Sequence, residues 1–536
     1  MTDLAYPSGL PSGQGFVRLK ELRDCLRPRE VLRWRDLAVD GLAFHSAEVR
    51  SGNLFFAIRG AKNDGTAFAQ QAVLRGAVAV VAEEALSVPV PVLVVESARE
   101  ALADAARFYY RDPSRAIPVV GVTGTNGKTT VAHLIRACLQ ADRRQVGLLG
   151  TIAYEFGGRR IPAGNTTPDP VRIQGYLREM ADRFASACVM EVSSHSLDQD
   201  RVRGVEFAAG VFTNLSQDHL DYHGTMGAYR SAKARLFRGL GRGAVAVLNQ
   251  DDPASHAMAD ELQSGVGVLW YGRSPKADVR AEDVRPGPDG TRLRMVMPNG
   301  DVELFLRLVG EHNVHNALAA AASALALGAS ELTVASALED ARAVPGRLEL
   351  VESPTSGSQS GRVRVFVDYA HTPDALDKVC GTLAALGDGD LHVVFGCGGD
   401  RDRSKRGPMA RAVARHARCA YLTSDNPRSE DPERILADMV AGLDEGDGRG
   451  DPAGDRQREA RRHGAGRRQG PRDLPGVQGQ RGAVRRPAGG GARARGAGGG
   501  MVAPMKRPAR RRAATGGRAN AAGWMTPRAV AKAAGG

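Results

Sequence analysis

A glycine-rich turn followed by a lysine and two threonines lies between a predicted strand and a predicted helix. Residues 123–130 read Thr-Gly-Thr-Asn-Gly-Lys-Thr-Thr, after an apolar run at 117–122 and before a helix predicted over 129–139. Glycines allow backbone N–H groups to turn toward phosphate oxygens, and the helix N-terminus adds positive potential. We expect Lys128 to reach the β- and γ-phosphates of a nucleotide and the Thr129 hydroxyl to bind Mg²⁺. The turn therefore predicts nucleotide binding.

The spacing of this turn differs from that of the common phosphate loop, because Val122 stands where that loop has its first glycine. An ordinary strand–turn–helix corner is the alternative interpretation. Gly-Lys-Thr-Thr at the start of a helix rarely arises from packing alone, so nucleotide binding remains the better prediction.

Two clusters of acidic and histidine residues follow later strands. Residues 190–196 read Met-Glu-Val-Ser-Ser-His-Ser directly after a predicted buried strand, and residues 213–223 read Thr-Asn-Leu-Ser-Gln-Asp-His-Leu-Asp-Tyr-His. Glu191 and His219 are candidate Mg²⁺ ligands, because Mg²⁺ bound to a nucleotide needs few protein ligands. Each cluster alone fits a capped loop with surface polar residues equally well. Together with the glycine-rich turn, the clusters favour a nucleotide-dependent enzyme.

The elements that must position these groups alternate between strands and helices, which predicts an α/β fold with a parallel sheet covered on both faces. Ligand sites in such sheets lie at the carboxyl ends of the strands. The length predicts several domains: 1–115, a central unit at 116–343, a third at 344–448 and a low-complexity, disordered tail at 449–536, with a linker at 112–115. The predicted strands are residues 54–58, 77–81, 117–122, 188–192, 244–248, 363–368, 391–395 and 420–423.

Charge is distributed unevenly along the 536 residues. Residues 449–536 contain 21 lysines and arginines and 4 acidic residues, a net charge of +17, whereas the 52 basic and 56 acidic residues of 1–448 give −4. The overall charge of +13 therefore does not indicate a nucleic-acid partner for the folded part. Six scattered cysteines without a C-x-x-C pair, no signal-peptide pattern and no long apolar stretch predict a cytoplasmic protein that does not insert into membranes.

These motifs, taken in order, resemble those of the Mur ligase family. The glycine-rich turn and the two acidic and histidine clusters are similar to the family's motifs in the branch that adds diaminopimelate or lysine. The resemblance covers roughly residues 40–447 and implies a small N-terminal domain that binds the UDP substrate, a central ATP-binding domain with a phosphate loop and a parallel sheet, and a Rossmann-like C-terminal ligase domain, here truncated. The further matching segments are 165–168, 229–237, 312–316, 346–347, 368–374 and 395–402.

The resemblance implies ATP-dependent formation of an amide bond in peptidoglycan biosynthesis by a monomer. The D-glutamate γ-carboxylate of UDP-MurNAc-L-Ala-D-Glu would attack the γ-phosphate of ATP, and the amine of meso-2,6-diaminopimelate would then displace phosphate from the acyl phosphate. Lys128 would supply positive charge, Thr129 and Glu191 would bind one Mg²⁺, and His219 and Lys233 a second. Lys233 would carry a carbamate derived from CO₂, which turns a cation into a carboxylate-like ligand. A solvated helix lysine is the alternative for Lys233.

The resemblance also implies three sets of substrate contacts. ATP would contact Thr123, Gly124, Thr125, Asn126, Gly127, Lys128, Thr129, Asn313, Arg347 and Asp368. The UDP-dipeptide would contact Phe44, Ser46, Ala61, Lys62, Asn63, Asn165, Thr166, Thr167, Ser193, Gln199 and Arg201. Diaminopimelate would contact Arg401, Asp425, Asn426, Pro427 and Arg428.

Two positions qualify these assignments. His45-Ser46-Ala47 stands where many family members have Asp-Ser-Arg in the uracil pocket. An arginine fork binds a carboxylate bidentately, which suits Arg428 to the second carboxylate of diaminopimelate. The alternative for Arg428 is a tight Asn-Pro turn with a surface arginine.

Other functions remain open from the sequence. A lysine-adding ligase or a folylpolyglutamate synthase would share the fold and the acyl-phosphate chemistry, but the segments 165–168 and 425–428 favour diaminopimelate. A catalytically inactive binding protein with a basic tail is an alternative of a different class, and its support is the composition of residues 449–536.

The tail from about Arg449 onward is predicted to be read in the wrong frame. Its composition changes abruptly to Gly, Arg and Ala, and the family's closing motif, Gly-Lys-Gly-His-Glu, is absent from the chain. With the first nucleotide dropped, the genetic code permits residues 461–478 to read Gly-Asp-Thr-Val-Leu-Val-Ala-Gly-Lys-Gly-His-Glu-Thr-Tyr-Gln-Glu-Phe. For example, CAA-GGG-CCA-CGA-G encodes residues 469–472 and shifts to AAG-GGC-CAC-GAG, which is Lys-Gly-His-Glu. A real shift would remove core strands and part of the amino-acid site from the third unit.

Overall fold

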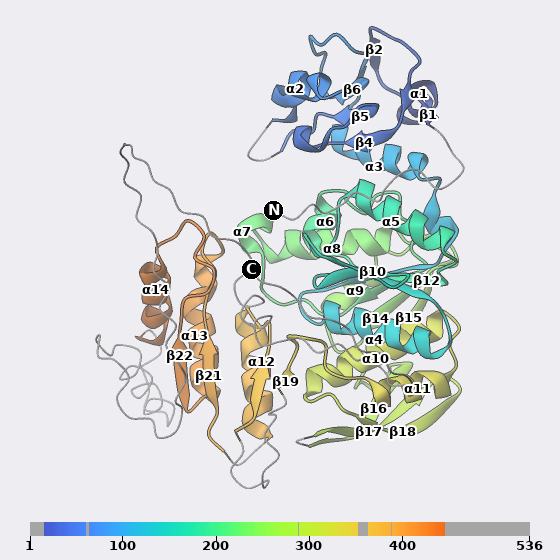
Figure 1. Cartoon of the computed structure of the whole chain (residues 1–536). Helices are drawn as coiled ribbons and strands as arrows, with labels where there is room; N and C mark the ends of the chain where they lie inside the picture. The colour runs from blue at the N-terminus through green and yellow to red at the C-terminus, as the bar shows by residue number, and fades with distance from the viewer. Residues whose placement is uncertain (1–15, 61–63, 288, 352–362, 387–388, 445–536) are drawn as a thin grey trace, which may run out of the picture. The chain divides into compact units, whose positions relative to one another are not determined.

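The computed structural model describes residues 16–60, 64–287, 289–351, 363–386 and 389–444. The predictions for Ala61, Lys62, Asn63 and the tail at 449–536 lie outside the described residues. Within the described ranges, no helix has the length and hydrophobicity needed to cross a bilayer. The helices and strands form three successive groups along the chain (Figure 1).

The first group is built on a five-stranded sheet of order β2-β7-β6-β5-β4, in which β4 to β7 are parallel and β2 pairs antiparallel with β7. Alternation along β5 sends Leu54 and Phe56 toward α1 and α3, and Phe55 toward α2. Its elements are β1 (Val17–Arg18), α1 (Leu19–Leu26), β2 (Glu30–Leu32), β3 (Ala38–Val39), β4 (Gly41–Ala43), η1 (Ser46–Glu48), β5 (Asn53–Phe56), η2 (Gly65–Phe68), α2 (Ala69–Leu74), β6 (Ala79–Ala82), β7 (Val92–Val94), α3 (Ala98–Tyr109) and η3 (Pro113–Arg115).

The second group contains an 11-stranded sheet of order β11-β10-β9-β12-β8-β13-β14-β15-β16-β17-β18. Its strands are β8 (Val119–Thr123), β9 (Val146–Leu149), β10 (Ala153–Phe156), β11 (Arg159–Pro162), β12 (Ala187–Glu191), β13 (Ala209–Phe212), β14 (Val245–Asn249), β15 (Gly267–Gly272), β16 (Val279–Gly287), β17 (Gly290–Met297) and β18 (Gly300–Leu306). The seven strands from β9 to β16 in the sheet order are parallel. Antiparallel hairpins at both edges were not predicted from the sequence.

Helices cover both faces of this sheet. Val120 and Val122 of β8 lie in a core with α4 and α10, and Val119, one residue away, lies in a second core with α5, α8 and α9. Figure 1 shows α4 and α10 next to each other, and the two helices are in contact. The helices are α4 (Lys128–Ala141), α5 (Pro170–Asp182), α6 (Ser194–Asp198), α7 (Leu220–His223), α8 (Met226–Arg238), α9 (Ala254–Ala259), α10 (Glu311–Ala326) and α11 (Glu331–Asp340).

The third group has two separate two-stranded sheets among its described residues. Strand β19 pairs antiparallel with β20, and β21 pairs parallel with β22. A core that includes Met409, Val413 and Met439 joins α13 to α14. The elements are β19 (Glu349–Val351), β20 (Val365–Val367), α12 (Pro373–Ala385), β21 (His392–Phe395), η4 (Arg403–Lys405), α13 (Arg406–His416), β22 (Cys419–Leu422) and α14 (Pro432–Asp444).

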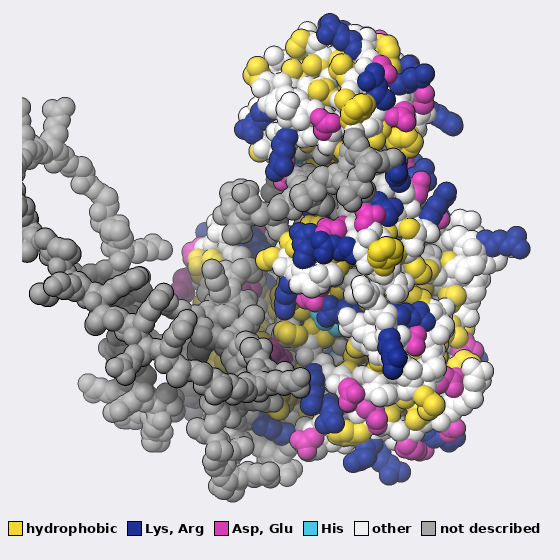
Figure 2. Space-filling view, turned by 45° about the vertical axis from the view of Figure 1, so that its right-hand side comes forward, with side chains coloured by type: hydrophobic (Ala, Val, Ile, Leu, Met, Phe, Trp, Pro, Cys, Tyr) yellow, Lys and Arg dark blue, Asp and Glu magenta, His cyan; other side chains and the backbone are white. Residues whose placement is uncertain are grey.

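The predicted α/β fold is confirmed, and each predicted strand coincides with an observed one to within two or three residues at its ends. The predicted linker at 112–115 is different: it forms the 3-10 turn η3, and Pro113 and Ser114 are buried. Asp112 caps this turn in the left-handed region at φ 46°. Figure 2 shows basic and acidic side chains interspersed on the face in view.

Candidate functional site

The glycine-rich turn connects the carboxyl end of β8 to the first residue of α4, as predicted. Gly124 has φ 146°, and a Cβ there would lie 1.8 Å from the Thr213 hydroxyl. Gly127 has φ 86°, and its Cβ would meet the Asn316 side chain at 2.5 Å. Both positions therefore require glycine. The first N–H groups of α4 have no acceptor within the helix, so this turn presents donors and positive potential to an anion.

Asparagine and threonine side chains of the neighbouring strand hold the turn in shape. Asn126 donates its backbone N–H to Asn214 Oδ1 at 3.0 Å, and Asn214 Nδ2 donates to Asn126 O at 3.0 Å. The Thr213 hydroxyl donates to the same carbonyl at 2.7 Å, and Thr125 N–H donates to Asn214 O at 2.9 Å. The loop is thereby fixed from the end of β13 before any nucleotide binds.

Two lysine amines meet on one carbonyl oxygen of the turn. Lys128 Nζ lies 3.0 Å from Gly124 O, and Lys233 Nζ, on α8, lies 2.7 Å from the same oxygen. Lys233 is 1% exposed, and its Nζ lies 4.1 Å from the centre of the Tyr229 ring. Burial, followed by the charge of Lys128, lowers the pKa of Lys233 well below its usual value. A solvated helix lysine, the alternative interpretation, is therefore wrong for Lys233.

Glu191 ends β12 and is 1% exposed. Its carboxylate accepts hydrogen bonds from the Thr129 hydroxyl at 3.0 Å, from Thr151 N–H at 2.8 Å and from the Thr151 hydroxyl at 3.0 Å. The predicted pair Thr129 and Glu191 is thus adjacent, and Thr151, at the end of β9, was not predicted. Hydroxyl and carboxylate oxygens are the ligands that Mg²⁺ prefers, and water and phosphate oxygens usually complete its shell. The residues present fit one Mg²⁺ at this position.

His219 precedes α7 in the left-handed region, at φ 54°. Burial lowers the pKa of His219 to about 3, so its ring is neutral and able to bind a metal at neutral pH. The rings of His219 and Tyr229 are 6.2 Å apart, and Lys233 packs on the same tyrosine. Among the described residues, no group of three or more His, Cys, Asp and Glu side chains converges as a metal site. A second metal at His219 would thus need a new anionic ligand, such as a carbamate on Lys233.

Asp218 is a buried carboxylate that sequence reasoning did not select, although it lies inside the second motif. It is 6% exposed, with His219 Nε2 at 3.4 Å, His371 Nε2 at 3.9 Å and Lys405 Nζ at 4.0 Å. Lys405 and His371 belong to the third group of elements. The charge of Asp218 therefore links that group to the nucleotide side of the site.

The residues predicted to bind the UDP-dipeptide divide into two sets. Thr167, Ser193, Gln199 and Arg201 form one network: Thr167 Oγ1 donates to Glu191 O at 2.8 Å and accepts from Ser193 N–H at 3.1 Å. Arg201 donates to Thr167 O at 3.1 Å and to Gln199 Oε1 at 2.7 Å.

The other described residues predicted to bind the UDP-dipeptide are outside this hydrogen-bond network. Thr166 accepts from the Thr151 hydroxyl at 3.1 Å, and Asn165 O accepts from Tyr154 at 2.7 Å. Phe44 and Ser46 belong to the first group, where the Ser46 hydroxyl donates to Gln71 Oε1 at 2.7 Å. Their contact with a UDP group stays a prediction.

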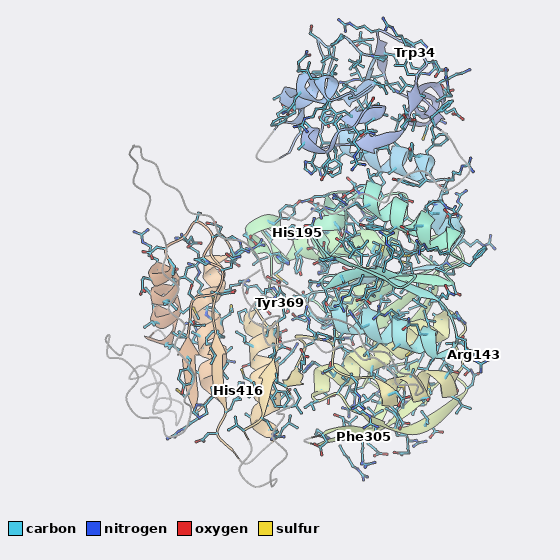
Figure 3. All side chains as sticks on the ribbon, in the orientation of Figure 1. Trp34, Arg143, His195, Phe305, Tyr369 and His416 are labelled. Carbon is cyan, nitrogen blue, oxygen red and sulfur yellow. The ribbon has the colours of Figure 1, made fainter. Side chains whose placement is uncertain are left out.

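A histidine that the prediction did not use stands beside the dipeptide network. Figure 3 labels His195 on α6, where its ring centre lies 4.8 Å from that of His219 and 4.3 Å from that of Tyr222. Burial lowers the pKa of His195 to about 4. Tyr222 OH donates to Asp198 at 2.8 Å, and Gln199 Nε2 donates to Tyr222 OH at 3.3 Å. These contacts fasten α7, which follows His219, to α6.

The three residues predicted to contact adenine and ribose all make hydrogen bonds within the protein. Asn313 donates to Val309 O at 2.9 Å and accepts from Asn316 at 3.0 Å. Arg347 donates to the Thr129 hydroxyl at 3.1 Å. Asp368 accepts the backbone N–H groups of Leu348 and Ala370, both at 2.7 Å, and Figure 3 labels Tyr369 beside it. Arg347 thus contacts the start of α4 directly, and Asn313 is linked to the phosphate turn through Asn316, whose side chain lies against Gly127.

The segment predicted to select diaminopimelate is a tight turn after β22. Arg428 is exposed, has φ 50° and donates Nη1 to Gly399 O at 2.6 Å. Asn426 O accepts from Gly399 N–H at 2.9 Å. Within the part of the chain that the structure describes, Nε and Nη2 of Arg428 make no hydrogen bond, which leaves one edge of the fork for a carboxylate. Arg401 and Asp425 are exposed near this turn, and Pro427 is part of it.

Comparison with known proteins places these motifs in one family. Residues 122–324 match the Mur ligase middle domain, residues 346–463 the Mur ligase glutamate ligase domain, and residues 38–110 the Mur ligase family catalytic domain.

Similar sequences carry one name. The chain is 46% identical over 413 residues to the UDP-N-acetylmuramoyl-L-alanyl-D-glutamate--2,6-diaminopimelate ligase of Geobacillus thermodenitrificans, an alignment that covers 76% of this chain and 83% of that protein. It is 43% identical over 435 residues to the protein of the same name from Geobacter metallireducens, covering 80% of this chain and 84% of that protein.

Solved structures agree in fold. A structure of a UDP-N-acetylmuramoyl-L-alanyl-D-glutamate--2,6-diaminopimelate ligase has a TM-score of 0.61 and 33% identity, covering 81% of this chain and 87% of that one. Mycobacterium tuberculosis folylpolyglutamate synthase, complexed with ADP, has a TM-score of 0.53 and 22% identity, covering 63% of this chain and 81% of that one, and shares the fold alone. The phosphate turn, the acidic and histidine clusters and the similar proteins all agree, and the chain belongs to the Mur ligase family.

Proposed function

We propose that this chain uses ATP to ligate meso-2,6-diaminopimelate to UDP-MurNAc-L-Ala-D-Glu. The observation that carries the proposal is the Asp425–Arg428 turn, whose arginine presents a free edge of its guanidinium. The names of relatives more than 40% identical over most of their length point to the same reaction. A phosphate turn and a turn suited to a carboxylate are two of the three sites that such a ligation needs.

The chain's own residues supply positive charge where two anions must meet. Lys128 is held beside the turn by the carbonyls of Gly124 and Thr125, and Arg347 reaches the Thr129 hydroxyl from the third group. These cations neutralise phosphate charge while the dipeptide carboxylate attacks the γ-phosphate. Mg²⁺ held by Thr129 and Glu191 would add charge neutralisation at the same place.

A carbamate on Lys233 is supported by the shared carbonyl. Two ammonium groups within hydrogen-bonding distance of one oxygen repel each other, and burial favours the neutral amine. A neutral amine reacts with CO₂ to form a carbamate and release one proton. The product is an anion beside Lys128, so the modification replaces a repulsive pair by an attractive one and supplies the ligand that His219 lacks.

The amino-acid end of the reaction would be read by Arg428. A bidentate bond to the distal carboxylate of diaminopimelate leaves the reacting amine to face the acyl phosphate. L-Lysine lacks that carboxylate, so the desolvated guanidinium would stay unpaired, which costs more than losing a neutral contact. This difference favours diaminopimelate over lysine. The likeness to folylpolyglutamate synthase is one of fold only, so it does not favour a folate substrate.

The test is phosphate release with ATP and UDP-MurNAc-L-Ala-D-Glu, with one amino acid added at a time. We expect meso-diaminopimelate to be used at least roughly 100-fold better than L-lysine, as kcat/KM. Equal use of L-lysine, or release that depends on L-glutamate and a folate, would contradict the proposal. A gel-shift assay with nucleic acid, on the full chain and on a chain ending at residue 448, tests the alternative of a basic-tailed binding protein.

A further inference from the structure

Arg406, the first residue of α13, is a buried cation outside the site described above. Its side chain is 1% exposed, yet it belongs to a residue type that is seldom buried without partners. Its Nη2 lies 2.9 Å and 3.1 Å from the two carboxylate oxygens of Glu430, and its Nη1 lies 2.7 Å from Asp438 Oδ2 on α14. One guanidinium therefore fastens the residues after the Asp425–Arg428 turn to two helices.

Glu430 also binds the Gly396–Asp402 loop, which faces the Asp425–Arg428 turn. Its carboxylate accepts the Asp400 N–H at 2.5 Å and pairs with Arg403 at 2.9 Å. Asp400 in turn accepts from the Ser429 N–H at 3.0 Å and from the Ser429 hydroxyl at 2.8 Å. The hydrogen bond from Arg406 lowers the pKa of Glu430, so the acceptor is charged at neutral pH.

The two loops touch through their backbones, and this contact depends on glycine. A Cβ on Gly399 would lie 1.9 Å from Pro427 O, and one on Gly396 would lie 2.5 Å from Thr423 O. Arg428 donates to Gly399 O in the same contact, from a left-handed backbone at φ 50° that is unfavourable for a residue with a side chain. The left-handed backbone at Arg428 therefore needs stabilising contacts from the surrounding residues.

We propose that Arg406 is a positioning residue for amino-acid selection: its ion pairs with Glu430 and Asp438 hold the Asp425–Arg428 turn against the Gly396–Asp402 loop, so that the Arg428 fork is fixed before the amino acid binds. This inference rests on the proposed function only for the identity of the amino acid. A planar guanidinium engages two carboxylates at once, whereas a lysine at the same position would reach one.

The experiment compares Arg406→Lys and Arg406→Met with Arg415→Met in the full chain. Arg415 lies on the same helix, is 60% exposed and pairs with Asp377, so its loss removes a charge from α13 without touching the turn. Hydrogen exchange of a peptide covering residues 423–431 is measured by mass spectrometry, together with KM for meso-diaminopimelate and for ATP. Glu430→Gln, which weakens the pair without removing the buried cation, is measured alongside in case Arg406→Met fails to fold.

We expect exchange in this peptide to accelerate roughly tenfold or more in Arg406→Met, with Arg406→Lys and Glu430→Gln intermediate and Arg415→Met unchanged. The KM for diaminopimelate should rise by about tenfold or more while the KM for ATP changes less than about twofold. Unchanged exchange in folded Arg406→Met, or equal rises in both KM values, would overturn the inference. Slow exchange in the unmodified chain together with equal use of meso-diaminopimelate and L-lysine would instead contradict the proposed function and leave the positioning role supported.

Discussion

The central sheet and the strands of the third group differ in how well their apolar side chains are covered. Strand β8 has a parallel neighbour on each side, and Val119, Val120 and Val122 are 0% exposed. Among the described residues, β20 and β21 each pair along one edge, and Val365 and Val394 are 51% and 70% exposed. The phosphate side of the site thus rests on a complete core, and the amino-acid side on a sheet whose edges lack partners in the described chain.

The frame prediction would account for this difference. Paired neighbours and apolar cover are what a buried parallel strand normally has. In the shifted frame, residues 463–467 would read Thr-Val-Leu-Val-Ala, an apolar run suited to such a strand. The predicted consequence is a stable nucleotide-binding half and a weakened amino-acid half.

The largest effect is expected for Lys233→Ala, which changes the nucleotide-binding half. Removing the amine removes the carbamate and the ligand that His219 requires, so ligation should fall by about 10³-fold or more. Short carboxylic acids at millimolar concentration should restore part of the activity by occupying the space of the carbamate. Lys276→Ala, an exposed lysine of the same domain, is the control. Activity of Lys233→Ala equal to that of the unmodified chain would remove Lys233 from the site.

Arg428→Ala should affect the amino-acid half alone. Leaving the diaminopimelate carboxylate unpaired costs about 1–3 kcal/mol, which corresponds to a rise in its KM of roughly 5- to 150-fold. The KM for ATP should hardly change, because the phosphate turn lies between β8 and α4, outside the third group. Arg415→Ala serves as the exposed control. A parallel rise in the KM for ATP would mean that Arg428 acts through the general fold.

Thermal unfolding should separate the two halves. Because β20 and β21 are each paired along one edge among the described residues, we expect a first transition at lower temperature and a second one for the central sheet. ATP analogue at 100 times its Kd should stabilise the second by about 2.7 kcal/mol and the first much less. A dye that fluoresces on apolar surfaces should bind before the second transition. One cooperative transition that nucleotide shifts as a whole would argue against this division.

The last experiment concerns sensitivity to acid and compares two histidines, one in each half. Burial lowers the pKa of His312 on α10 from its ordinary value of 6.5 to about 4. As the pH falls, the unfolded chain therefore takes up this proton first. Stability that His312 contributes is present above pH 6.5 and is lost between about pH 6.5 and 4, at up to about 1.4 kcal/mol per pH unit.

His312→Gln should reduce this acid sensitivity, whereas His392→Gln, at an exposed position of β21, should leave it unchanged. The measurement is urea unfolding at several pH values between 4 and 7. Identical slopes for the unmodified chain and His312→Gln would show that this burial does not shift the titration as described.

The strands that precede the motifs could be predicted from the sequence, because a buried parallel strand is a short apolar run. The phosphate turn could be predicted because glycines followed by lysine and threonine at a helix start are typical of nucleotide binding. Lys233 was selected only through the family resemblance, since one lysine on a helix gives no signal of burial, and its role as a metal ligand stays a prediction. Thr151 and Asp218 were missed because their importance comes from side chains distant in the sequence, Glu191 and Lys405. The edge hairpins of the central sheet were missed, although the alternation of Arg292, Leu293, Arg294 and Met295 in β17 is typical of a strand with one buried face.

The most direct measurement compares the 536-residue chain with one in which a single-nucleotide change restores the frame near codon 449. Intact mass and gene sequencing first establish which chain is natural. We predict that both bind an ATP analogue with the same Kd, and that the 536-residue chain ligates meso-diaminopimelate much more weakly than the restored chain. Full diaminopimelate ligation by the 536-residue chain, or a restored chain that prefers L-lysine, would contradict the account.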